Sequence, residues 1–269
     1  MWPNVNDRRL FTALLVILIA LAWLALWAWG QSPYARYLNH EELEVISLPE
    51  DTVLLFVFVG GWTVMTVAMM LPTSLPLIVM FHALTRRRPD RLWLVVLLVA
   101  GYLGTWTLFG ATAHLADWIL HEAVEGSVWL EANAWMLGAG ILVVGGVFQF
   151  TPLKYYCLDK CRSPLSFIME HWRGRHERMH ALWLGVRHGI FCIGCCWALM
   201  LLMFVVGVAN IGWMLALGAV MAVEKNMPWG RRLSAPLGVL LLAWGVILVL
   251  FPMPAIGEVV AQVVARPWG

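Results

Sequence analysis

Four residues that suit a soft metal ion lie at helical spacing in one hydrophobic stretch of this chain. His188, Cys192, Cys195 and Cys196 occupy the offsets i, i+4, i+7 and i+8, which fall on one face of an α-helix. Thiolate and imidazole are donors that suit Cu(I) or Zn(II). We therefore predict that these four residues bind a metal as a set, copper first and zinc as the alternative. Packing of small hydrophobic thiols is the competing explanation, as is close approach of a second helix at the glycines of this stretch, Gly189 and Gly194.

Other sulfur-bearing residues extend this candidate site. The chain has five cysteines, and an odd number without extracellular pairs argues against a disulfide framework. Methionine thioether is a neutral Cu(I) ligand that suits an apolar site, although methionine also fills irregular cores. The additional candidates are Cys157, Cys161, Met65, Met69, Met200 and Met203.

Glu224 and Lys225 form a charged pair at the end of a hydrophobic stretch. A carboxylate at membrane depth is costly and marks a pathway or a bound partner, so Glu224 is a further candidate for the metal site. The alternative is that Lys225 extends to the lipid headgroups while Glu224 pairs with Arg231 or with Lys225 itself.

The composition identifies the class of protein that must position these residues. Of 269 residues, 61% are hydrophobic and only 13% are charged, whereas soluble domains are about a quarter charged. The chain is therefore expected to be an all-α, polytopic transmembrane helix bundle with the lipid bilayer as its main partner. A net charge of +2 gives no indication of nucleic-acid binding. No phosphate-binding glycine loop is present, so pumping driven by ATP has no support.

Hydrophobic stretches predict about seven spans in a single domain, at 10–29, 53–83, 92–116, 134–152, 182–208, 211–227 and 235–251. The second contains Pro72 and Pro76, which predicts a kink whose freed carbonyls are satisfied by neighbouring helices. Lysine and arginine concentrate in alternate loops, and the longest of these, about 153–181, is expected to be a basic cytoplasmic loop. The positive-inside rule then places the N-terminus inside and the C-terminus outside.

Three blocks of residues resemble a family of bacterial predicted metal-binding integral membrane proteins of unknown function, over about 55–250. The first block runs from Trp62 through Met69 and Met70 to Pro72. The second contains Thr151-Pro152-Leu153-Lys154, Cys157 and Cys161-Arg162-Ser163-Pro164. The third contains His188-Gly189, Cys192, Gly194-Cys195-Cys196-Trp197-Ala198-Leu199-Met200, Asn210, Trp213-Met214, Glu224-Lys225 and Pro228. Ala209 departs from the pattern, which has a methionine before the asparagine. The resemblance implies metal binding in the inner membrane of a bacterium and no particular reaction.

The favoured function is binding and delivery, transport or homeostasis of a soft metal, with cytoplasmic thiols passing ions to a deeper cysteine and methionine site. A non-catalytic accessory subunit of a larger membrane metalloenzyme complex is the alternative. A membrane thiol oxidoreductase is disfavoured, because such enzymes need cysteines at the oxidising face of the membrane. Other membrane subunits or a metal chaperone are the expected protein partners.

Overall fold

The structure is a computed structural model that describes residues 5–31, 48–127, 129, 133, 135–172, 177–206 and 210–250. Regular structure in these residues is helical, with no strand, which confirms the predicted all-α fold. The helices are α1 (Val5–Gly30), α2 (Leu48–Met69), α3 (Leu71–Leu84), α4 (Arg91–Glu125), α6 (Trp135–Phe148), α7 (Pro152–Arg162), α8 (Pro164–His171), α9 (Glu177–Val206), α10 (Ile211–Asn226), the 3-10 turn η3 (Gly230–Leu233) and α11 (Ser234–Leu250).

Several of these helices are long and apolar enough to cross a membrane. Among the described residues, four helices meet this criterion alone, by length and composition: Arg9–Gly30, Arg91–Val124, Glu177–Met203 and Gly230–Leu250. Two bent pairs, α2 with α3 and α6 with α7, raise the number to six if each pair is one span. The predicted stretch 211–227 corresponds to α10, which has only 16 residues. Helix length and composition therefore support a membrane protein, while the seven spans and their orientation stay predictions.

The break between α2 and α3 lies at Met70, and the two helices meet at 67°. Pro72 stands in the first turn of α3, where a missing N–H is tolerated. The carbonyl oxygen of Met70 accepts hydrogen bonds from Thr73 Oγ1 at 2.8 Å and from the Tyr102 hydroxyl at 3.2 Å. The predicted kink is thus confirmed, and α4 supplies one of the donors that satisfy it.

The predicted loop 153–181 contains two helices, which corrects the sequence-based interpretation. Thr151 caps α7, because its side-chain oxygen accepts a hydrogen bond from the backbone N–H of Lys154 at 3.3 Å, and Pro152 is the first helical residue. Lys154 was expected to be a loop charge, yet it is fully buried. Residues 173–176 of the predicted loop lie outside the described part of the chain.

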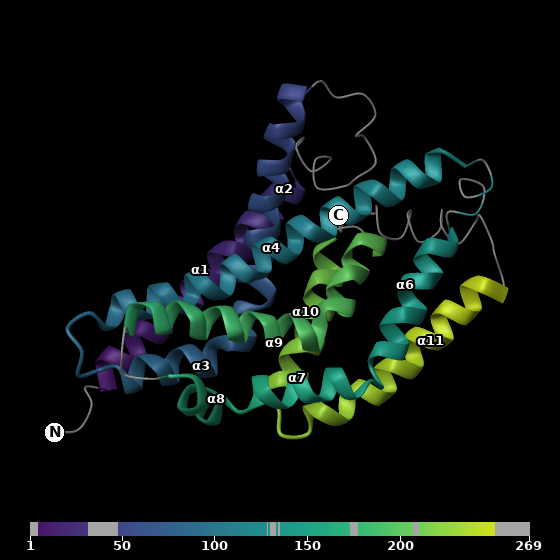
Figure 1. Cartoon of the computed structure of the whole chain (residues 1–269). Coiled ribbons are helices and arrows are strands. Elements are labelled where there is room, and N and C mark those ends of the chain that lie inside the picture. The colour runs from purple at the N-terminus through teal and green to yellow at the C-terminus, as the bar shows by residue number, and fades with distance from the viewer. Residues whose placement is uncertain are drawn as a thin grey trace.

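Helix α9 is the central element, and glycines set how closely its neighbours approach. A Cβ at Gly185 would collide with the carbonyl oxygen of Leu98 on α4, and one at Gly189 would lie 2.8 Å from Thr105 Cβ. Helices α4 and α9 therefore lie side by side (Figure 1). At Gly194 the nearest atom would be Cys157 Sγ of α7, at 2.6 Å. The close packing predicted at Gly189 and Gly194 is confirmed.

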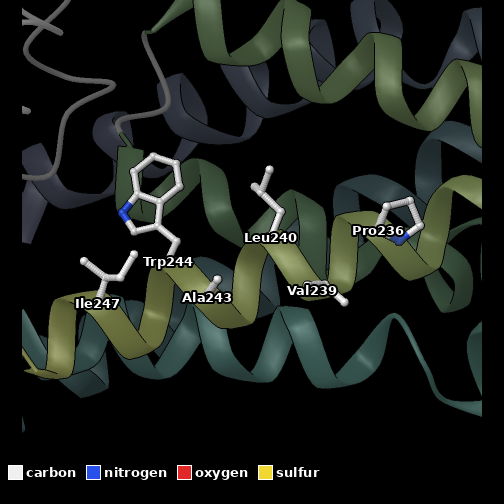
Figure 2. A pocket seen from close by; sticks show the side chains of 6 residues that line it. All are labelled: Pro236, Val239, Leu240, Ala243, Trp244 and Ile247. Carbon is white, nitrogen blue, oxygen red and sulfur yellow. The ribbon is translucent and has the colours of Figure 1, made fainter.

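Helix α11 packs along α6 (Figure 1) and exposes an apolar face. A hollow on this face is lined by Pro236, Val239, Leu240, Ala243, Trp244 and Ile247, as Figure 2 shows. These side chains offer no carboxylate, thiol or imidazole to a metal ion. The hollow is therefore suited to lipid contact and not to metal binding.

Candidate metal-binding site

Three sulfur atoms meet in the interior, and we call Cys192, Cys196 and Met70 the sulfur cluster. Cys192 and Cys196 lie one turn apart on α9, and Met70 comes from the break between α2 and α3. Cys196 Sγ is 3.8 Å from Met70 Sδ. The three side chains are at most 1% exposed. A helix stripe and a helix break, far apart in sequence, thus bring two thiols and one thioether together.

The Lys225 ammonium reaches into this cluster from the last turn of α10. Its Nζ lies 2.9 Å from Cys192 Sγ, 3.8 Å from Cys196 Sγ and 3.9 Å from Met70 Sδ. A fourth contact, at 3.3 Å, is to Thr73 Oγ1. The side chain is only 6% exposed. The alternative in which Lys225 extends to the lipid headgroups is wrong, because the lysine points inward to the sulfur atoms.

Tyr102 of α4 closes the cluster on another side. Its hydroxyl is 3.1 Å from Cys192 Sγ and also donates to the Met70 carbonyl oxygen. Tyr102 is only 1% exposed, so its hydroxyl group contacts these two partners instead of solvent. A single hydroxyl therefore ties one thiol of the cluster to the helix break that supplies the thioether.

A second pair of thiols lies on the α7 side of α9. Cys195 Sγ is 4.0 Å from Cys161 Sγ, and Cys161 is the partly exposed member. A disulfide bond would require about 2.05 Å between the sulfur atoms, and all five cysteines are free. Cys195 and Cys196 both donate to the carbonyl oxygen of Cys192, at 3.1 and 2.9 Å. We call Cys161 and Cys195 the outer thiol pair. It borders the sulfur cluster and extends toward the surface, and Cys157 packs beside it.

His188 is buried but has partners of its own. Its Nε2 is 3.0 Å from Ser74 Oγ of α3, and its ring stacks with that of Tyr102 at a centroid distance of 5.5 Å. Its Nδ1 has no hydrogen-bond partner among the described residues. His188 therefore shares Tyr102 with the sulfur cluster, while the polar contact of its ring is to Ser74 and not to a thiol.

Glu224 belongs to a second buried group, the charged cluster, with Lys154, Gln149 and Ser234. Lys154 Nζ donates to the two carboxylate oxygens of Glu224 at 2.8 and 3.0 Å and also to Gln149 Oε1. Ser234 Oγ donates to Glu224 Oε1 at 2.6 Å. All four residues are at most 2% exposed. The carboxylate of Glu224 and the ammonium of Lys225, neighbours in sequence, are thus directed to two different sets of partners.

Two surface ion pairs lie near α7, and one of them involves Arg231, the alternative partner of Glu224. Arg231 pairs with Asp159 at 3.1 Å rather than with Glu224, so that alternative is wrong. Lys160 of α7 pairs with Glu170 of α8 at 2.7 Å. The hydrogen bond from Lys160 holds the pKa of the Glu170 carboxyl below its usual value. These contacts fasten α7 to its neighbours at the surface.

The predicted ligands do not all come together. Within the described residues, no three side chains drawn from His, Cys, Asp and Glu are placed to hold one metal ion. The structure buries the predicted methionines Met65, Met69, Met200 and Met203 in the core, where ordinary packing accounts for them. The donor set that does converge is two thiols with the thioether of Met70. Such a set fits Cu(I), a soft ion, better than a metal that prefers oxygen ligands.

Sequence reasoning did not place Lys225 or Tyr102 in the site, and it weighed Met70 as a thioether only together with the other methionines before Pro72. Met70 stands directly before Pro72, and a methionine at a helix break is a signal that could have separated it from Met69. Lys225 had such a signal too, since a lysine in an apolar helix end needs a partner. Tyr102 had no comparable signal, because a tyrosine in a membrane helix is common.

A family model described as copper chaperone, PpoB2, matches residues 59–248. The matched region includes the sulfur cluster, the outer thiol pair and the charged cluster. It also overlaps nearly all of the region, about 55–250, in which the sequence resembles metal-binding membrane proteins. No curated protein and no solved structure matches the chain.

Proposed function

Because the chain belongs to the PpoB2 copper chaperone family, we propose that it is an integral membrane protein that receives Cu(I) and hands it on. The observation that carries this proposal is the convergence of Cys192, Cys196 and Met70 on one buried point. Two thiols and one thioether are soft donors, and they lie in an interior from which water is excluded. Copper is here the cargo and not a resident cofactor.

The outer thiol pair supplies a route for this cargo. Cys161 is partly exposed and Cys195 is buried, and their sulfur atoms are 4.0 Å apart. Cys195 in turn borders the sulfur cluster, because it hydrogen-bonds the backbone of Cys192. An ion arriving at Cys161 would exchange one thiolate ligand for the next without any change in oxidation state. The outer pair is the receiving point, and the sulfur cluster is the holding point.

The direction of delivery depends on which side of the membrane the outer thiol pair faces. Arginines and lysines in alternate loops support an N-terminus in the cytoplasm, seven spans and a cytoplasmic position for Cys157 and Cys161. The protein would then take Cu(I) from the reducing compartment across the inner membrane of a bacterium. Reporter fusions after Arg91 and after Glu125 should give opposite sides, with Arg91 in the cytoplasm, and the same side for both would contradict the span assignment and the side given to every cysteine.

Binding of Cu(I) to purified protein tests the proposal. We expect the parent chain to bind Cu(I) in competition with a Cu(I)-specific chelator, and the variant Cys192→Ser with Cys196→Ser to lose that binding. Cys157→Ser is the matched control, because Cys157 is a buried thiol that packs against Gly194, outside the sulfur cluster. Equal binding by the parent and the double variant would refute the assignment and leave packing as the role of these thiols.

A further inference from the structure

The place in the sulfur cluster where a cargo ion would lie already holds a cation. Lys225 Nζ is within 4 Å of all three sulfur atoms, at 2.9, 3.8 and 3.9 Å. An ion bound by the same three atoms would have to occupy nearly the same point. The ammonium group and the ion exclude each other sterically, so Lys225 must move before the cluster can be filled.

The partners of Lys225 are unusual for a buried lysine. An ammonium group is a compact, strongly hydrated charge with three donors, and sulfur is a weak acceptor for such donors. Thr73 Oγ1 is the oxygen that Lys225 contacts among the described residues. The adjacent carboxylate of Glu224 is directed instead to Lys154 and Ser234. A hard cation is therefore held mainly by soft atoms, and a soft cation would be the better match for them.

We infer that Lys225 is a tethered cation that fills the sulfur cluster when it is empty and is displaced when Cu(I) binds. This inference rests on the proposed function. Ammonium and Cu(I) each carry one positive charge, so replacing one cation by the other does not itself change the charge of the buried site. No electron moves. Each copper–sulfur bond formed in the cluster replaces one that Cu(I) had with the donor, and each thiol proton that the cluster loses passes to a donor thiolate that has released the ion.

The position of Lys225 allows the displacement without unfolding. Helix α10 ends at Asn226, and both Asn226 and Met227 are exposed. The lysine side chain is long and flexible, so its ammonium can turn toward the helix end while the stem stays packed. Because the competitor is tethered, its effective concentration at the cluster is on the order of millimolar or higher. Lys225 would thus limit the affinity for Cu(I) and favour its release, as a protein that hands copper on requires.

Removing the ammonium is the test. In full-length purified Lys225→Leu we expect the dissociation constant for Cu(I) to fall by about tenfold or more, because the ion no longer has to displace a competitor. Release to excess chelator should become slower by a similar factor. Lys160→Leu is the matched control, since Lys160 is a partly exposed lysine that pairs with Glu170. Its affinity should stay within about twofold of the parent.

The possible results separate a failure of this inference from a failure of the proposed function. Weaker or unchanged Cu(I) binding by Lys225→Leu would overturn the inference, because the ammonium would then support the bound ion or have no part in its exchange. If the leucine variant does not insert, Lys225→Gln removes the charge at similar length, and the same tightening is expected. A parent chain that binds no Cu(I), or that binds it equally after Cys192→Ser with Cys196→Ser, would refute the proposed function itself.

Discussion

Two buried lysines of this protein show how the same charged group can have opposite roles. Lys154 contacts oxygen: both carboxylate oxygens of Glu224 and the amide oxygen of Gln149. Lys225, whose neighbour in sequence is that same Glu224, contacts three sulfur atoms and one hydroxyl. Both are nearly inaccessible to solvent. The partners, and not the degree of burial, distinguish the two sites.

These partners indicate which of the two lysines has a permanent position and which can be exchanged. A lysine fully paired with a carboxylate leaves no weak contact that another cation could replace. The ion pair between Lys154 and Glu224 connects α7 to α10, and the hydrogen bond from Ser234 connects α11 to the same carboxylate. A lysine on sulfur has no carboxylate partner in the described part of the chain, and it occupies the position that a soft cation would favour. The charged cluster is therefore structural, and it holds α10 where Lys225 reaches the sulfur cluster.

The largest expected effect comes from breaking the charged cluster. Lys154→Met leaves the Glu224 carboxylate buried without its cation, which is expected to destabilise the protein by about 3–5 kcal/mol. The unfolding temperature in detergent measures this loss of stability and should be lower than that of the parent. The double variant Lys154→Met with Glu224→Gln should recover most of the stability, because no buried charge remains unpaired. If Lys154→Met is no less stable than Lys225→Leu, the contrast between the two lysines is wrong.

A smaller effect is expected at the thioether. Met70→Leu conserves volume, so its stability should change by less than about 1.5 kcal/mol, while the affinity for Cu(I) falls by about tenfold through the loss of one sulfur donor. Met69→Leu is the control, because Met69 is a buried methionine that packs against α10, where a Cβ at Gly218 would lie 3.7 Å from Met69 Cγ. An equal loss of affinity in both variants would mean that the methionines act through packing alone.

The smallest effect is expected at the outer thiol pair, where only the rate of copper uptake should change. Cys161→Ser removes the partly exposed thiol that borders Cys195. Copper taken up from a small thiol complex should arrive several times more slowly, while the equilibrium affinity stays within about twofold of the parent. Stopped-flow competition with a chelator separates the two quantities. A lower affinity with an unchanged rate would place Cys161 in the holding site and remove the relay.

Helical periodicity predicted part of the site because it is a local property. Cys192 and Cys196 are one turn apart, so their common face could be derived from spacing, and the kink near Pro72 followed from the missing N–H of proline. The charges of α7 are typical of a loop, but in the structure they are satisfied by tertiary partners. The local signal for this helix is the Thr151-Pro152 pair at its start.

The assignments that failed all depend on long-range partners. Lys154 and Glu224 are 70 residues apart in sequence, and no local pattern connects them. Once Lys154 holds Glu224, Lys225 has no carboxylate beside it and turns to the sulfur atoms. The sequence alone could therefore mark Glu224 and Lys225 as an unusual pair, but it could not decide which of the two residues faces the thiols.

The most direct test of copper binding at the sulfur cluster is the coordination of Cu(I) in the loaded parent protein, measured by X-ray absorption at the copper edge. We predict a ligand shell of sulfur atoms without a nitrogen donor, and loss of one sulfur neighbour in Met70→Leu. A shell that contains imidazole nitrogen from His188, or one that is unchanged in Cys192→Ser with Cys196→Ser, would contradict the assignment of the sulfur cluster as the site that holds copper.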